Sequence, residues 1–305
     1  MKPEIGTSFS LHYCTELGLS KKQVLRAAID DLGIKRFRLM SYWNIHEPKP
    51  GKYDFSELDW QMDMVARAGA KVSLCVGKRQ PRWPECHIPD WALELPKEHW
   101  YEALYHYVGL VVQRYRDHPA LHSWQLENEA FLKSFGECRD GDFNRGRIRR
   151  EMKIIRHYDP QHQVIMTLSG DKGLPIFGPI PDKFGLTIYP IVTDPEGNYK
   201  HLNKPAWRYK LKAMIIKGYS NRDTFIHELQ AEPWANKPLI EVPLDEQDKS
   251  MNPGLLRENF DFALKTKLTP PIYLWGMEWW YWRKHIHDDS SMWNAAKELV
   301  SGFQR

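Results

Sequence analysis

The chain alternates between short apolar runs and segments with apolar residues at helical spacing, and it does so eight times. The runs have the length and the β-branched and aromatic content of buried strands. They are predicted at Ile5–Phe9, Arg36–Met40, Lys71–Val76, His122–Glu129, Gln163–Leu168, Leu186–Tyr189, Asp223–Glu228 and Pro271–Trp275. Strand–helix alternation predicts a parallel sheet with crossover connections. At 305 residues, eight such units predict an α/β chain folded as one (β/α)8 barrel domain over residues 1–305.

Helix signals separate most of these strands. Ser20, Ser56 and the Asn252-Pro253 pair are predicted to start helices, and Gly33 and Gly69 to end the first two. Further helices are predicted at Trp100–Tyr115, Asn144–Tyr158, Trp207–Lys217, Leu255–Lys265 and Ser291–Phe303, and a loop at Asp171–Asp182. An open doubly wound sheet is the alternative, but no glycine-rich phosphate turn follows the first strand.

Composition narrows the class of protein. With 42% hydrophobic and 27% charged residues, the chain is predicted to fold, and its net charge of +4 is small. Two basic clusters, Arg145–Arg150 and Lys210–Lys217, are interpreted as solvated helix faces, and no motif predicts a nucleic-acid partner. No signal peptide or membrane span is visible, which predicts a cytoplasmic protein without a membrane partner, or a secreted one if a leader was removed.

Metal and redox signals are weak. The four cysteines show no CxxC spacing, and Cys75 is predicted to be a buried thiol. His285, His287 and Asp288 are chelating residue types, but a polar loop is the default interpretation. We therefore expect no metal and no cofactor.

Two predicted strands end in carboxylates. Trp124-Gln-Leu-Glu-Asn-Glu129 follows an apolar run, and Thr224-Phe-Ile-His-Glu228 ends in the same way. Ionised groups resist desolvation unless they are paired or used. Active sites of (β/α)8 barrels lie where the strands end. Glu129 and Glu228 are therefore predicted to be a catalytic pair, with Glu232 as a rival to Glu228.

These motifs resemble the clan of retaining (β/α)8-barrel glycoside hydrolases that includes cellulase-type and β-galactosidase-type families. In that clan Asn-Glu ends strand four, like Asn128-Glu129, and a Glu ends strand seven, like Glu228. An Arg on strand two, a Tyr after strand six and a Trp ending strand eight match Arg38, Tyr189 and Trp275. The loop Glu47–Phe55 is also similar, and the resemblance covers essentially the whole chain.

The resemblance implies a retaining glycoside hydrolase that needs no cofactor and acts on β-linked carbohydrate. Glu129 would be the acid/base and Glu228 the nucleophile. Arg38 and Tyr189 would orient Glu228, and Asn128 would bind the sugar hydroxyl beside the anomeric carbon. Further candidates for substrate binding are Glu127, which strand alternation places on the side of Glu129, and Trp43, His46, Trp234, Trp275, Trp279 and Glu278.

Two alternatives stay open. A transglycosylase would use the same residues with a sugar as acceptor instead of water. A carbohydrate-binding barrel would have lost catalysis, although it has no need for Glu129, Glu228, Arg38 and Tyr189 together. The sugar, exo or endo action and the oligomeric state are not predicted.

Overall fold

The computed structural model describes residues 4–133, 136, 138, 143–175, 178–194 and 196–303. Its residue contacts divide the chain into two compact units. The terminal unit combines the stretch up to Arg36 with the stretch from Leu186, and the central unit runs from Phe37 to Gly185.

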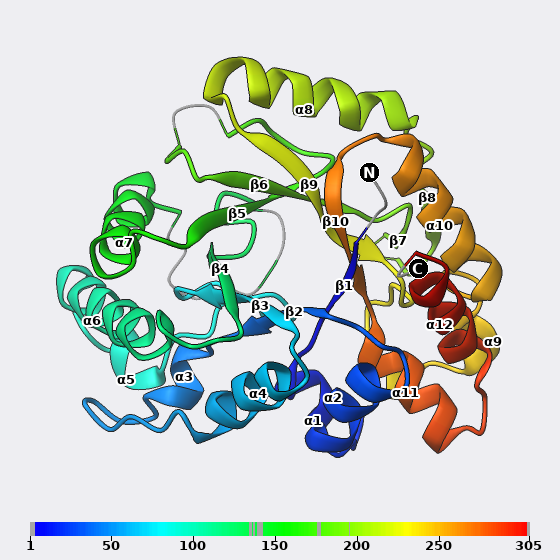
Figure 1. Cartoon of the computed structure of the whole chain (residues 1–305), viewed down its shortest axis with the longest axis horizontal. Helices are drawn as coiled ribbons and strands as arrows, with labels where there is room; N and C mark the ends of the chain where they lie inside the picture. The colour runs from blue at the N-terminus through cyan, green and yellow to red at the C-terminus, as the bar shows by residue number, and fades with distance from the viewer. Residues whose placement is uncertain are drawn as a thin grey trace. The chain divides into compact units, whose positions relative to one another are not determined.

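Eight strands form a closed parallel barrel in the order β1-β10-β9-β6-β5-β4-β3-β2 (Figure 1). The strands are β1 (Ile5–Ser8), β2 (Arg36–Met40), β3 (Lys71–Val76), β4 (Leu121–Leu126), β5 (Gln163–Ser169), β6 (Lys183–Ile188), β9 (Asp223–Gln230) and β10 (Thr269–Trp275). Barrel neighbours follow one another along the chain, with only the short strands β7 and β8 between β6 and β9. The predicted (β/α)8 barrel is confirmed, and the open doubly wound sheet is excluded.

In the central unit, β4 pairs in parallel with β3 and β5, and helices α6 and α7 lie side by side (Figure 1). The helices of this unit are α3 (Trp43–His46), α4 (Ser56–Arg67), α5 (Asp90–Leu93), α6 (Lys97–Tyr115) and α7 (Arg145–Tyr158). Asn144 caps α7 through side-chain bonds from the N–H groups of Gly146 and Arg147. The helix predicted at Ser56 has Phe55 in the cap position instead.

In the terminal unit, β10 pairs with β1 and β9, and α12 packs on α10 and α11. The remaining elements are α1 (Leu11–Glu16), α2 (Lys21–Asp30), a hairpin of β7 (Ile191–Thr193) and β8 (Tyr199–His201), α8 (Ala206–Ser220), η1 (Leu239–Glu241), α9 (Leu244–Gln247), α10 (Pro253–Lys265), α11 (Met277–Ile286) and α12 (Ser291–Phe303). Asn252 caps α10 as predicted, whereas the side chain of Ser20 makes no cap bond in α2.

Strand ends differ from the predicted ones where the candidate site begins. β4 stops at Leu126, three residues before Glu129, because Glu127 and Glu129 adopt left-handed backbone with φ of 52° and 40°. β9 continues two residues past Glu228 to Gln230. The segment after β10, expected to be a strand-end loop, is helix α11.

Cysteines and membrane signals complete the fold. Cys86 and Cys138 form a disulfide in the central unit, which the sequence did not predict, while Cys75 is a buried free thiol as expected. Within the part of the chain that the structure describes, no helix is long and apolar enough to cross a membrane.

Candidate active site

Glu228 lies on β9 with its side chain almost completely buried. The Tyr189 hydroxyl donates a hydrogen bond to Glu228 Oε2 at 2.7 Å. The Trp234 and Tyr189 rings form a T-shaped pair with centroids 5.1 Å apart, and Trp234 itself is only partly buried. The predicted contact between Tyr189 and Glu228 is confirmed, and it fixes one oxygen of the carboxylate.

The backbone beyond Glu228 is held by a polar clamp. The amide of Gln230 accepts a hydrogen bond from the Ile191 N–H at 3.0 Å and donates to the Ile191 carbonyl at 2.7 Å. Gly276, at φ 138°, lies so close to Glu232 that a Cβ there would be 2.6 Å from the Glu232 Cβ. This close packing joins the segments that follow β9 and β10. Glu232, which comes after Glu228 in the sequence, is buried there.

Arg38 on β2 is the centre of a network in the central unit. Its Nε donates to Gln125 Oε1 at 2.5 Å, and its Nη2 donates to Asn128 Oδ1 at 2.7 Å. All three side chains are buried. The network fixes the orientation of the Asn128 amide, because Arg38 donates a hydrogen bond to the amide oxygen. The predicted action of Arg38 on Glu228 stays a prediction.

Glu85 is a fourth member of this network that sequence reasoning missed. Both of its carboxylate oxygens accept from Asn128 Nδ2, at 3.1 and 3.2 Å, and Arg79 pairs with it at 3.3 Å. Glu85 is buried and has a φ of 73°. The sequence gave no signal for Glu85, because its partners Arg79 and Asn128 are 6 and 43 residues away along the chain.

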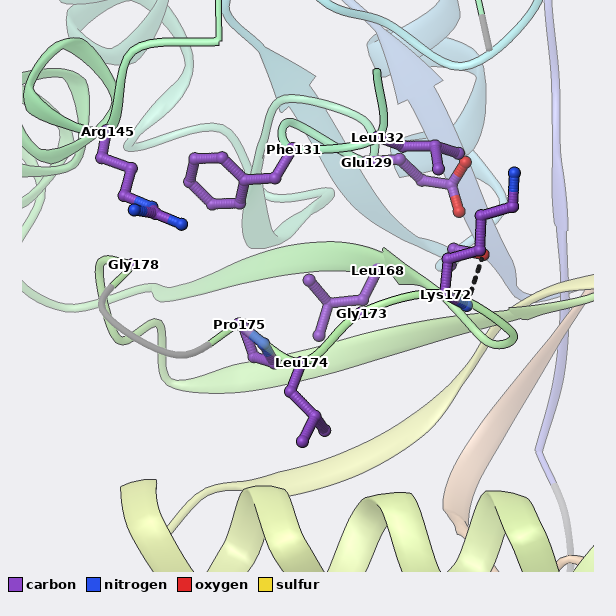
Figure 2. A pocket seen from close by; sticks show the side chains of 11 residues that line it. Glu129, Phe131, Leu132, Arg145, Leu168, Lys172, Gly173, Leu174, Pro175 and Gly178 are labelled. Atoms are coloured by element: carbon purple, nitrogen blue, oxygen red, sulfur yellow. Dashed lines mark hydrogen bonds between the residues drawn. The ribbon is translucent and has the colours of Figure 1, made fainter. Parts of the chain in front are cut away.

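Glu129 lines a small pocket of the central unit, about 110 Å³ in volume. Figure 2 shows its carboxylate at one end, with Phe131 and Arg145 on one wall and Leu168 and Leu174 on another. The loop that follows turns back at once, since the Leu132 N–H donates to the Glu129 carbonyl at 2.7 Å. The side chain of Glu129 is therefore presented to a partly apolar space beside the end of β4.

Glu127 does not share the environment of Glu129, which corrects the expectation from strand alternation. It lies beyond the end of β4 and is completely buried against Arg147 of α7, with Nη1–Oε1 and Nη2–Oε2 distances of 2.6 and 3.1 Å. Arg147 also pairs with Glu151 one helical turn later. Burial raises the pKa of the Glu151 carboxyl to about 8, against the opposing charge of Arg147.

Several predicted substrate contacts are corrected by burial. Trp43 is completely enclosed and donates to Glu47 Oε2 at 2.7 Å, and Trp279 is enclosed and donates to Gln247 Oε1 at 2.6 Å. His46 is buried on α3 with Nδ1 2.8 Å from the Tyr107 hydroxyl. These groups bind protein partners, so we interpret them as parts of the core.

Two candidates, on β10 and in the first turn of α11, are also buried. Glu278 accepts a hydrogen bond from the Ser10 N–H at 2.5 Å, which ties α11 to the start of α1. Trp275 is 7% exposed. Among the residues that the structure describes, no group of three or more His, Cys, Asp or Glu side chains is arranged to hold a metal ion.

Comparisons with known proteins agree with this fold. Residues 26–96 match the model of glycosyl hydrolase family 42, described as beta-galactosidase. The beta-galactosidase Bga of Halorubrum lacusprofundi is 28% identical over 121 residues, which are 34% of this chain and 17% of that protein. A beta-galactosidase of an Arthrobacter species is 34% identical over 101 residues, 27% of this chain and 15% of that protein.

Solved structures are similar over nearly the whole chain. The beta-galactosidase of the psychrophilic Marinomonas ef1 superposes with a TM-score of 0.64 and 14% identity, covering 100% of this chain and 60% of that one. The GH5_18 protein of Streptomyces cattleya, in complex with GlcNAc, gives a TM-score of 0.61 and 12% identity over 90% of this chain and 70% of that one. At these identities the likeness concerns the fold.

The closed parallel barrel and these matches together show what the chain is similar to: its fold is that of the (β/α)8-barrel glycoside hydrolases among these solved structures. Its sequence similarity over residues 26–96 is to the beta-galactosidases of family 42. The aligned regions are 17% and 15% of the two relatives and 60% of the Marinomonas structure, so the chain corresponds to only part of those proteins.

Proposed function

We propose that this chain hydrolyses β-linked glycosides with retention of configuration, through a covalent glycosyl–enzyme intermediate. Glu228 attacks the anomeric carbon, and Glu129 protonates the leaving oxygen and then activates the water. The beta-galactosidase relatives support a β-galactoside as the first substrate to test.

The hydrogen bond between Tyr189 and Glu228 carries this proposal. A nucleophilic carboxylate must stay ionised and aim one oxygen at the anomeric carbon. A phenol O–H that donates to Oε2 at 2.7 Å holds the carboxylate in one orientation.

The surroundings of Glu129 support the role of acid. The leaving group of a glycoside lies beside the proton donor, and Glu129 borders a pocket with the apolar side chains Phe131, Leu168 and Leu174. Such a wall suits the less polar face of a sugar ring or an aryl aglycone. Arg38 and Glu85 fix the orientation of the Asn128 amide. A group that binds a sugar hydroxyl requires such a fixed orientation.

Azide rescue tests both roles at once. Wild-type protein, Glu228→Ala and Glu129→Ala are compared on 2,4-dinitrophenyl β-galactoside and on a panel of other aryl β-glycosides. We expect azide to restore turnover in both variants, giving the α-glycosyl azide with Glu228→Ala and the β-glycosyl azide with Glu129→Ala. Glu232→Ala, at a neighbouring buried carboxylate, is the matched control and keeps hydrolysis without azide.

The outcomes also separate the alternatives. Products with two sugars in place of the free sugar would indicate a transglycosylase. Sugar binding that is equal in wild type and Glu228→Ala, with no turnover of any aryl glycoside, would contradict the proposal in favour of a binding protein.

A further inference from the structure

Helix α8 exposes an apolar stripe. Trp207 is 62% exposed and Met214 is 60% exposed, and Leu211, Ile215 and Tyr219 are also exposed. The helix buries only Tyr209 and Ile216 among its described side chains, where it packs on β9 and α10. Barrel helices ordinarily turn their apolar side chains inward. Single exposed apolar residues are common, but five on one helix mark an interaction surface.

Basic residues border this stripe on both sides. At 100° per residue, Trp207, Leu211 and Met214 lie opposite the buried pair Tyr209 and Ile216. Lys210 and Lys217 then fall on one flank. Arg208 and Lys212 fall on the other, beside Ile215 and Tyr219. The helix contains no Asp or Glu from Ala206 to Ser220. Lys217 in the last turn of the helix pairs at 2.9 Å with Asp223, which lies at the start of β9.

We propose that α8 lies on the surface of an anionic lipid bilayer, with its apolar stripe among the acyl chains and its basic flanks among the headgroups. Trp, Leu, Ile and Met on one side and Lys or Arg beside them are the composition of interfacial helices. Long basic side chains extend from such a helix to the headgroups while their methylene groups stay in the apolar region.

Charge favours this partner over a second copy of the chain. An isologous contact through α8 would bring the basic flanks of two copies together without a carboxylate from either helix. An anionic bilayer supplies the opposite charge over the whole length of the helix. The proposal differs from the sequence-based expectation of no membrane partner, because the exposure of the stripe is visible only in the fold.

Vesicle co-sedimentation tests the proposal. The full chain is mixed with vesicles of phosphatidylcholine alone or with phosphatidylglycerol, at about 0.1 M and about 0.5 M salt. We expect binding to the anionic vesicles that weakens at high salt. The triple variant Trp207→Ser, Leu211→Ser, Met214→Ser should lose more than roughly tenfold in affinity. The pair Arg208→Gln, Lys210→Gln should lose roughly fivefold per charge.

Matched controls come from other exposed positions of the terminal unit. Ile240→Ser and Ile286→Ser remove apolar side chains that are 50% and 56% exposed, and Lys265→Gln with Lys267→Gln removes two exposed charges. These variants should bind vesicles like the wild type. Circular dichroism checks that each variant is folded, and hydrolysis of a water-soluble aryl glycoside should be unchanged in all of them.

Three results would overturn the proposal. They are no binding to anionic vesicles at low salt, equal binding by the triple variant, and a dimer without lipid that the triple variant dissociates, which would assign the stripe to a second copy. None of them bears on glycoside hydrolysis, which the azide experiment tests separately.

Discussion

At the scale of single residues, the two proposed catalytic glutamates are held in different ways. Glu228 lies within a regular strand, and one of its oxygens accepts the Tyr189 hydroxyl. Glu129 lies in left-handed backbone just beyond a strand and borders a pocket. A nucleophile needs a fixed, ionised carboxylate, whereas a proton donor that later accepts a proton needs contact with the leaving group and water.

Removing the Tyr189 hydroxyl tests the first of these environments. Tyr189→Phe should lower kcat/KM by roughly 10- to 100-fold, because a hydrogen bond to a charged group contributes about 1.5–3 kcal/mol. The measurement is the rate on an aryl β-glycoside. Tyr199→Phe is the control, since the Tyr199 hydroxyl donates to the Glu246 carbonyl at 2.9 Å in the same unit. Equal rates for the two variants would remove Tyr189 from the site.

His46 predicts a pH dependence of stability. Burial lowers the pKa of His46 from 6.5 to about 4, so the unfolded chain binds a proton at a higher pH than the folded chain. The contribution of neutral His46 to stability is therefore fully present at pH 7. As the pH falls from about 6.5 towards 4, the free energy of unfolding falls by roughly 3 kcal/mol.

Urea unfolding of wild type and His46→Gln at pH 7 and pH 4 measures this effect. The wild type should lose more free energy of unfolding between the two pH values than the variant does. His201→Gln, at an exposed histidine, should behave as the wild type does. Parallel losses in wild type and His46→Gln would contradict the assignment.

At the scale of elements, α7 supports the end of β4. The sequence predicted a helix at Asn144–Tyr158 but interpreted Arg145–Arg150 as a solvated face, and the Asn144 cap was not predicted. Arg147 is instead buried, on the same side of the helix as Ile148, Met152 and Ile155. That helical spacing was a usable signal. Its partner Glu127 lies 20 residues earlier, and no local pattern connects the two.

This pair is predicted to position Glu129. Glu127 is two residues before Glu129, and a bidentate Arg147 fixes the left-handed turn between them. Arg147→Lys keeps the charge but loses the fork. Its rate should fall at least roughly tenfold more on an alkyl β-glycoside than on a 2,4-dinitrophenyl glycoside, because only the alkyl leaving group needs proton donation.

Two controls on α7 separate positioning from stability. Arg150→Lys alters a bidentate but exposed pair with Glu102, and Met152→Ala destabilises the same helix without touching a carboxylate. Both should affect the two substrates equally. An equal loss on both substrates in Arg147→Lys would assign the pair a purely structural role.

Helix α11 shows where element prediction failed. Met277–Ile286 holds three Trp and a Tyr, and seven of its ten residues are buried, Glu278 and Arg283 among them. Without an amphipathic stripe, the periodicity that identified the other helices is absent. Trp279 was therefore predicted to bind substrate, although it is completely buried in the core.

At the scale of the whole molecule, the eightfold alternation was sufficient to predict the barrel, since strand period, helix spacing and short connections all agree on it. The candidate residues at the strand ends were predicted from the same alternation of strands and helices and from the resemblance to known barrels. What the sequence lacked were partners distant along the chain, such as Glu85 with Asn128 and Cys86 with Cys138.

Trapping the glycosyl–enzyme tests the central claim most directly. The wild type is incubated with a 2,4-dinitrophenyl 2-deoxy-2-fluoro-β-glycoside of the sugar that it hydrolyses, and its mass is measured before and after digestion. We predict the addition of one fluoroglycosyl group per chain, on the peptide that contains Glu228 and at that carboxylate. A label on Glu232 or Glu129, or an unlabelled enzyme that still turns over the parent glycoside, would contradict the proposed mechanism.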